Sequence, residues 1–197
     1  MFPGICIFYI RKELYMKKTF FWTALFCILL SAHAFGKNNK ILIAYFSKTG
    51  NTRKVASLIQ ASTGGRLFEI KTTNEYPKEY HATLARARKE QQTGFRPKLR
   101  ERILNISAYK IIFIGFPNWW HTMPMSVLTF IESHNLAGKT VVPFCTHGGG
   151  GVENCFRDFN KALFRSKIHA GFVVSGDEAG SSGPAIAAWL RRLRMIK

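Results

Sequence analysis

The sequence predicts an α/β protein built on a doubly wound, five-stranded parallel sheet, with helices on both faces in a three-layer sandwich. Continuous apolar runs, such as I-L-I-A-Y-F at 41–46 and I-I-F-I-G-F at 111–116, are typical of strands buried on both sides. Segments with apolar residues at helical spacing alternate with these runs, as in repeated β–α units. The 197 residues, 47% of them hydrophobic, suit one domain with its own core and exclude general disorder.

The first half of the domain contains two predicted strands and two predicted helices. They are a strand at 41–46, a helix at 52–60, a strand at 67–70 and a helix at 78–92, followed by a basic connector at 93–102. Val55 and Ile59 lie on one face of the first helix, and Gly64 ends it because glycine readily adopts the left-handed conformation. Pro77 is predicted to open the second helix, since its fixed φ suits the first helical position. This second helix is strongly polar and should lie on the surface.

The second half adds three predicted strands and three predicted helices. The strands lie at 110–116, 139–145 and 168–174, and the helices lie at 125–133, at 152–163 and from Pro184 onward. Phe156, Phe159 and Leu163 recur at helical spacing in the second of these helices, and Ile186 and Trp189 do so in the last. The predicted helices of this second half therefore have apolar faces with which to cover the sheet.

Residues 1–34 are predicted to be a signal peptide ahead of the domain at 35–197. A pair of lysines precedes the apolar run F-F-W-T-A-L-F-C-I-L-L at 20–30, and the small-residue pattern A-H-A ends at Ala34. The run is shorter than the roughly 18–20 residues that a membrane-spanning helix needs. We expect translation to start at Met16, cleavage after Ala34 and export to the periplasm. The alternative is an uncleaved N-terminal membrane anchor.

The chain is strongly basic, with 29 Lys and Arg against 11 Asp and Glu. Without residues 1–34, 25 basic and 10 acidic residues remain, a net charge of +15. The basic residues follow no nucleic-acid-binding motif, and an exported protein rarely meets nucleic acid, so we expect no nucleic-acid partner. Two interpretations stay open: a solvated basic face, or attraction to an anionic membrane surface or to acidic partners.

A ligand is expected in the loops after the first, third and fourth strands, because parallel sheets bind ligands at the carboxyl ends of their strands. The first loop, S-K-T-G-N-T at 47–52, joins a buried strand to a helix start. Its hydroxyl groups, its amide and the N–H groups of the helix predict a phosphate cradle. The loop matches neither the G-K-[ST] ending of a Walker loop nor G-x-G-x-x-G. The alternative is a polar turn with a helix cap.

The second loop, P-N-W-W-H-T-M-P at 117–124, contains two adjacent tryptophans. Neighbours in an extended segment point to opposite sides, so core packing accounts for one of them and stacking on a flat aromatic ligand for the other. The third loop, at 146–151, contains four glycines, which let backbone N–H groups approach a ligand closely. His121 and His147 lie in these two loops, and each either hydrogen-bonds the ligand or faces solvent.

The remaining reactive residues indicate no metal site and no covalent chemistry. The six histidines lack metal-ligand spacing, and the sequence has no Ser-His-Asp order and no C-x-x-C motif. Cys145 and Cys155 are the two cysteines of the mature chain. We expect two free thiols, with a disulfide as the alternative.

In combination, these motifs resemble the flavodoxin family, and in particular the short-chain flavodoxin-like proteins that bind FMN. The resemblance covers residues 40–195 and rests on five segments in order. These are S-K-T-G-N-T at 47–52, E-I-K-x-x-x-x-Y-P-x-x-Y at 69–80, R-A-R-K-E at 86–90, I-I-F-I-G-F-P-N-W-W at 111–120 and G-K-T-V-V-P-F-C-T-H-G-G at 138–149. It implies a flavodoxin-like fold and FMN as the cofactor, with no catalytic side chain beyond the flavin.

The resemblance also implies which residues hold FMN. The first loop would hold the phosphate, the second would line the ribityl chain and the isoalloxazine face, and the third would approach the pyrimidine edge. The implied cofactor-binding residues are Ser47, Lys48, Thr49, Gly50, Asn51, Thr52, Pro117, Asn118, Trp119, Trp120, His121, Thr146, His147, Gly148 and Gly149. His147 departs from the small hydroxyl residue common at its position, which concerns the pyrimidine edge and not the phosphate site.

The implied function is redox chemistry. It would be electron transfer, or flavin-dependent reduction of a quinone or another small molecule, with an unidentified partner protein or small-molecule acceptor. The alternative is a non-enzymatic module of the same fold that binds an anionic ligand or partner, because a fold alone does not fix a function. Flavin absorbance of the purified protein distinguishes the two.

Overall fold

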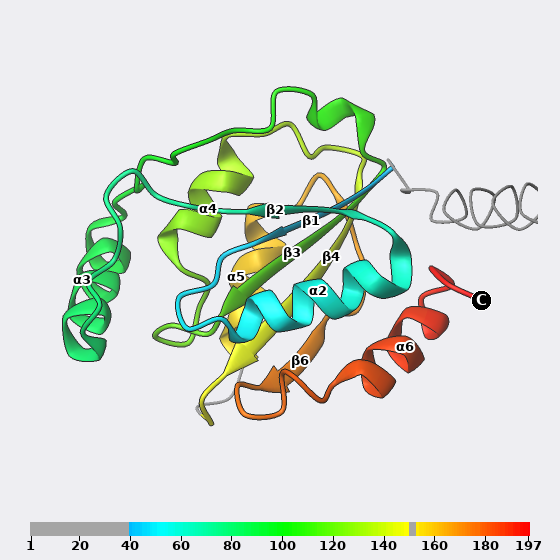
Figure 1. Ribbon diagram of the computed structural model, residues 1–197. Helices are drawn as coiled ribbons and strands as arrows, with labels where there is room; N and C mark the ends of the chain where they lie inside the picture. Colours follow the sequence, from blue (N-terminus) through cyan, green and yellow to red (C-terminus); the bar gives the residue numbers. More distant parts are fainter. Residues whose placement is uncertain (1–39, 150–152) are drawn as a thin grey trace, which may run out of the picture. The chain divides into compact units, whose positions relative to one another are not determined.

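The computed structural model describes residues 40–149 and 153–197. The described strands form one parallel sheet in the order β2-β1-β3-β4-β5, with β6 also paired with β4 (Figure 1). They are β1 (Ile41–Tyr45), β2 (Arg66–Glu69), β3 (Ile111–Pro117), β4 (Thr140–His147), β5 (Lys167–Ile168) and β6 (Phe172–Ser175). The helices are α2 (Asn51–Thr63), α3 (Tyr80–Thr93), α4 (Met125–Glu132), α5 (Glu153–Ala162) and α6 (Gly183–Arg192), with a 3-10 turn η1 (Ile106–Ala108). The doubly wound parallel sheet is therefore as predicted.

Two apolar layers hold the sheet between its helices. Neighbouring residues of β3 serve opposite layers, because successive side chains of a strand alternate between faces. Phe113 packs with Ile59 of α2 and Trp189 of α6, whereas Ile114 packs with Phe130 of α4. All five side chains are buried, and each contributes roughly 1.5–3 kcal/mol to stability.

The predicted fifth strand at 168–174 is wrong in one respect, because it is interrupted. β5 and β6 both pair with β4. Residues 169–171 between them are not in a strand, although the His169 N–H still donates to the carbonyl of Val141 (3.0 Å). Pro143 of β4 lies opposite this gap and has no N–H to donate to a neighbouring strand. The carbonyl of Ala170, within the gap, accepts a hydrogen bond from the Trp189 indole of α6 (3.0 Å). The Phe156 ring fills the space beside Gly171, where an added Cβ would lie 2.6 Å from it.

The predicted start of the helix after Pro77 is also wrong. α3 begins at Tyr80, because Glu79 caps it in an extended conformation (φ −63°, ψ 134°). The carbonyl of Pro77 accepts a hydrogen bond from the Thr83 hydroxyl (2.7 Å), which holds the proline in the approach to the helix rather than in its first turn. α3 stands beside α4 at one side of the sheet (Figure 1), and its side chains are mostly exposed, as predicted.

The strands all run in one direction, which gives the domain two distinct ends. The three predicted ligand loops follow β1, β3 and β4 at the carboxyl ends of these strands. The predicted signal peptide and its cleavage site lie outside the described residues. Among the residues described, no helix is both long enough and apolar enough to cross a membrane.

Candidate functional site

Hydrogen bonds bring the three predicted loops together at the carboxyl end of the sheet. The N–H of Asn118, just after β3, donates to the carbonyl of Thr146 at the end of β4 (2.7 Å). The hydroxyls of Thr52 and Thr146 lie 2.9 Å apart and are buried. This hydroxyl pair connects the start of α2 with the end of β4, so the first and third loops share one site.

The first loop is shaped to receive an anion at the start of α2. Gly50 precedes the helix with a φ of 93°, a left-handed conformation that favours glycine. The Ser47 hydroxyl accepts a hydrogen bond from the backbone N–H of Arg53, in the first turn of α2 (3.2 Å). The first N–H groups of a helix have no partner within it, and the positive end of the helix dipole lies there as well. Thr49 is exposed beside these groups.

Two residues of this loop contact other parts of the chain. The Lys48 ammonium donates to the carbonyl of Tyr76 (3.3 Å), so it supports the loop after β2. The Asn51 side chain packs against Gly176, where an added Cβ would lie 2.5 Å from the Asn51 amide nitrogen. Gly176 in turn donates its N–H to the carbonyl of His147 (2.8 Å). The loop after β6 is therefore a fourth part of the site, which the sequence analysis missed.

The second loop contains a strained turn. Trp119 and Thr122 exchange two backbone hydrogen bonds (3.0 and 3.1 Å) across Trp120 and His121. Both central residues have positive φ, 51° and 63°, as a type I′ turn requires, although such turns favour Asn and Gly. Residues other than glycine in this region cost roughly 1–3 kcal/mol each and concentrate at functional sites.

The two tryptophans have different surroundings, as the sequence predicts. Trp119 packs edge-on against Phe46 (ring centroids 5.3 Å apart) and Tyr76 (5.1 Å). Trp120 is 38% exposed. Its indole N–H donates to the carbonyl of Leu84 in α3 (2.9 Å), and the Arg88 guanidinium lies 4.8 Å from the ring centre. Helix α3 therefore supports the aromatic turn from outside the sheet.

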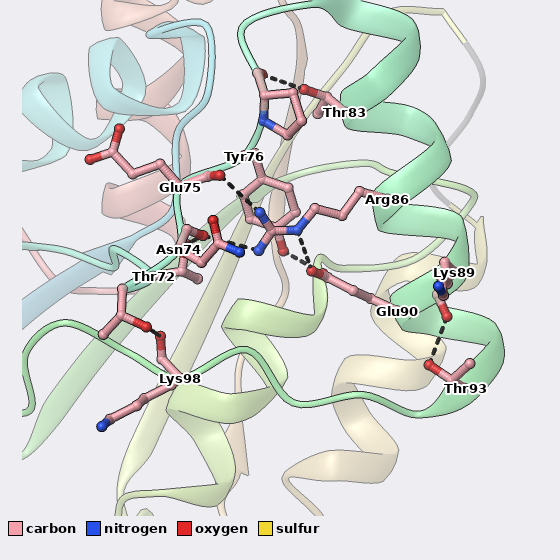
Figure 2. A network of polar contacts seen from close by, with 12 residues as sticks. Thr72, Asn74, Glu75, Tyr76, Thr83, Arg86, Lys89, Glu90, Thr93 and Lys98 are labelled. Atoms are coloured by element: carbon pink, nitrogen blue, oxygen red, sulfur yellow. Dashed lines mark hydrogen bonds and ion pairs between the residues drawn. The ribbon is translucent and has the colours of Figure 1, made fainter.

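A buried polar network lies behind Trp119 and connects it to α3. Figure 2 shows Arg86 and Glu90 directed toward the ring of Tyr76. Glu90 is 5% exposed and accepts hydrogen bonds from the Tyr76 hydroxyl (2.6 Å) and from Arg86 Nε (2.8 Å). Arg86 also lies over the Tyr76 ring, 4.2 Å from its centre. Burial and, secondly, the bond to Glu90 raise the pKa of Tyr76 far above its usual value, so the phenol stays protonated and donates.

The third loop continues β4 into the glycine-rich segment. Thr146 is buried, and Gly149 has a φ of 105°. The N–H of Gly149 donates to His147 Nδ1 (3.1 Å), so this histidine supports the loop through a ring nitrogen that accepts. Residues 150–152 lie outside the described part, as does the side chain of Cys155. Cys145 is fully buried, and the state of the two thiols remains a prediction.

The fifteen predicted site residues thus lie at one end of the sheet, on the three loops that the topology brings together. Contact of each with a cofactor remains a prediction. The residues that the sequence analysis missed are Tyr76, Leu84, Arg86, Arg88, Glu90 and Gly176. Within the described residues, no three metal-binding side chains form a cluster.

Comparisons with known proteins agree with this geometry. A model of the flavodoxin family matches residues 40–193. A search of curated proteins gave no match. A structure from Bacteroides eggerthii, provisionally described as a flavoprotein, is 35% identical with a TM-score of 0.70, over 78% of this chain and 97% of that one. A structure from Bacteroides uniformis with the same provisional description is 31% identical with a TM-score of 0.70, over 79% of this chain and 99% of that one.

A more distant structure shares the fold. It is a flavoprotein of Lactobacillus acidophilus in complex with FMN, 22% identical with a TM-score of 0.61, over 74% of this chain and 99% of that one. The family model covers more than half of this chain, and both Bacteroides structures match most of it. The chain therefore belongs to the flavodoxin family.

Proposed function

We propose that this protein binds FMN at the four-loop site and acts in redox chemistry outside the cytoplasm. The observation that carries the proposal is the anion site at the start of α2, joined to the glycine loop by the Thr52–Thr146 hydroxyl pair. Membership of the flavodoxin family supports the choice of cofactor. The FMN complex of the L. acidophilus protein, which shares this fold, supports it further.

The residues of this chain fit FMN in three ways. A doubly charged phosphate suits the first loop, because backbone N–H groups and the positive end of the helix dipole lie at the start of α2, together with the hydroxyls of residues 47–52. The exposed indole of Trp120 offers an aromatic surface. Gly148 and Gly149 are exposed on the third loop and have no heavy atom within 4 Å of an added Cβ, which leaves room for a ligand there. Bound FMN would supply one- and two-electron transfer, and the protein would set its position and exposure. The role is electron transfer or reduction of a small molecule.

The place of action is part of the proposal. The apolar run at 20–30 and the A-H-A pattern that ends at Ala34 support export to the periplasm. An exported chain would take its electrons from a membrane-bound or exported donor. Fractionation with N-terminal sequencing tests this, and an uncleaved protein recovered from the cytoplasm contradicts it.

We expect the apoprotein to bind FMN at least about a hundredfold more tightly than riboflavin, because charge-assisted hydrogen bonds to the phosphate contribute roughly 1.5–3 kcal/mol each. Fluorescence titration with both flavins and with FAD measures this. The substitution Thr49→Ala, at the exposed hydroxyl of this loop, should weaken FMN binding about tenfold. It should leave riboflavin unchanged, because riboflavin carries no phosphate.

Thr129→Val on α4 is the matched control, because its hydroxyl bonds only to the carbonyl of Met125 (2.9 Å). This variant should bind FMN like the wild type. Equal affinity for FMN and riboflavin would show that the start of α2 is not a phosphate site. A colourless protein that ignores FMN would favour the non-enzymatic binding module.

We expect Trp120→Ala to weaken FMN binding about fivefold to thirtyfold, because it removes the exposed aromatic surface of the second loop and the bond to Leu84. The remaining bound flavin should fluoresce more strongly, since a stacked indole quenches flavin emission. Trp189→Phe is the control, because that indole is buried at α6. If Trp120→Ala changes neither affinity nor fluorescence, Trp120 does not stack on the flavin.

A further inference from the structure

A row of lysines lies at the amino end of the sheet, opposite the ligand loops. Lys40 precedes β1, Lys110 precedes β3, Lys139 precedes β4 and Lys167 begins β5, so four neighbouring strands each start at a lysine. Lys40, Lys110 and Lys139 are in register, with backbone bonds from the Lys110 N–H to Lys40 (2.9 Å) and from the Thr140 N–H to Lys110 (3.1 Å). Lys167 is in register with Thr140, so it lies at the same end of the sheet but on the opposite face from Lys139. Neighbouring strands lie about 4.8 Å apart, so the row spans about 15 Å.

Three of these lysines are outside the ion pairs of the domain. Within residues 40–149 and 153–197, no ion pair includes Lys110, Lys139 or Lys167. Like charges on neighbouring strands repel one another, so this arrangement of lysines does not stabilise the fold. A row of ammonium groups suits an anionic surface better than a single small anion.

Two large apolar side chains stand beside the lysines and face solvent. Leu104 is 99% exposed and Phe164 is 80% exposed. The loop at 133–139 lies between them. His134 Nε2 accepts the backbone N–H of Ile103, next to Leu104 (3.1 Å). The carbonyl of Arg165, next to Phe164, accepts the N–H of Gly138 (2.9 Å). The Lys139 ammonium donates to the carbonyl of Tyr109 (2.6 Å), so the segment with Leu104 lies over the strand starts.

We propose that this end of the domain is a docking surface for a membrane with anionic phospholipids. The surface consists of Leu104, Lys110, Lys139, Phe164 and Lys167, called the basic end below. The lysines attract the headgroups, and the two apolar side chains enter the interface between headgroups and acyl chains. A nucleic acid would use the lysines but would leave Leu104 and Phe164 unexplained.

Docking through the basic end would leave the candidate site accessible. The ligand loops lie at the other end of the strands, so the site stays open to the aqueous side.

Vesicle co-sedimentation of residues 37–197 tests the proposal without the apolar run. This unit is expected to fold alone, because the solved relatives consist almost entirely of the matching domain. We expect it to bind vesicles of phosphatidylcholine with phosphatidylglycerol and not pure phosphatidylcholine. Lys110→Gln/Lys167→Gln should weaken binding about thirtyfold, since each lysine near an anionic leaflet contributes about fivefold. Leu104→Ser/Phe164→Ser should remove the binding that persists at high salt.

The control is Lys78→Gln/Lys89→Gln, which makes the same change in net charge at exposed positions near α3. It should retain binding to within about threefold, because long-range attraction between exposed charges is screened. Unchanged melting temperatures and FMN affinities would show that the variants fold. Equal weakening by the control pair, or no binding to the anionic vesicles, overturns the proposal. Binding to single-stranded DNA without binding to vesicles also overturns it and assigns a nucleic acid.

Discussion

Glu90→Ala should lower the free energy of unfolding by about 2–4 kcal/mol, because it removes the buried acceptor of the Tyr76 hydroxyl and the carboxylate that pairs with Arg86. Arg86 keeps its bonds to the carbonyls of Asn74 and Glu75. Urea unfolding followed by tryptophan fluorescence measures this change. The substitution should also weaken flavin binding, since Tyr76 supports the ring of Trp119 in the second loop. Glu90→Gln should lose less, because it keeps the shape and one acceptor.

A second Arg–Glu pair provides the matched control. Arg96 contacts both carboxylate oxygens of Glu132 (2.7 and 2.9 Å), as tight a geometry as that of Arg86 and Glu90, but this pair lies on the surface. Glu132→Ala should therefore cost no more than about 1 kcal/mol. Similar losses in both variants would mean that Glu90 is not a buried anchor of α3.

Gly115→Ala should lower the free energy of unfolding by about 1–3 kcal/mol or prevent folding, because there is no space for a side chain at this position of β3. An added Cβ would lie 2.0 Å from the ring of Phe144 on the adjacent strand β4. Both residues precede ligand loops, so the displaced ring should also disturb the loops at 117–122 and 146–149. Thermal unfolding and FMN titration measure the two effects.

Two further variants isolate the steric cause. Phe144→Leu removes the ring that an alanine at 115 would meet, so the double variant should lose less stability than the two single losses added. Gly180→Ala is the control, because its added Cβ would approach only the flexible side chain of Lys54, at 3.8 Å. A fully additive double variant would show that Phe144 is not the obstacle.

The strands were predictable because this sheet is buried on both faces. Its central strands are continuous apolar runs, and each is followed by a polar or glycine-rich loop, so the positions of these strands along the chain and the three ligand loops followed from the sequence. The break after β5 was not predicted. It lies opposite Pro143 of β4, which has no N–H to donate, but only the structure shows that this proline faces the fifth strand and that Ala170 bonds to Trp189 instead. The start of α3 depends likewise on the bond between Thr83 and Pro77.

The supports of the site were less predictable than its loops. The sequence indicated the two tryptophans, but a W-W-H-T segment carries no signal for a type I′ turn, since its central residues normally avoid positive φ. The contact between Trp120 and Leu84 joins residues 36 apart in the chain. Glu90 looked like one more charge on a polar helix, and only the tertiary structure shows that it is buried.

Parallel β–α units also align the helix dipoles of the domain in one direction. The helices α2, α4, α5 and α6 each follow a strand and run back along the sheet, so their first turns lie at the ligand loops and their last turns at the basic end. Each helix carries about half a positive charge at its start and half a negative charge at its finish. An anionic ligand at one end and a row of ammonium groups at the other are therefore both in favourable fields. If the ligand were a cation and the lysines were acidic residues, the dipoles of these helices would destabilise the charges at both ends.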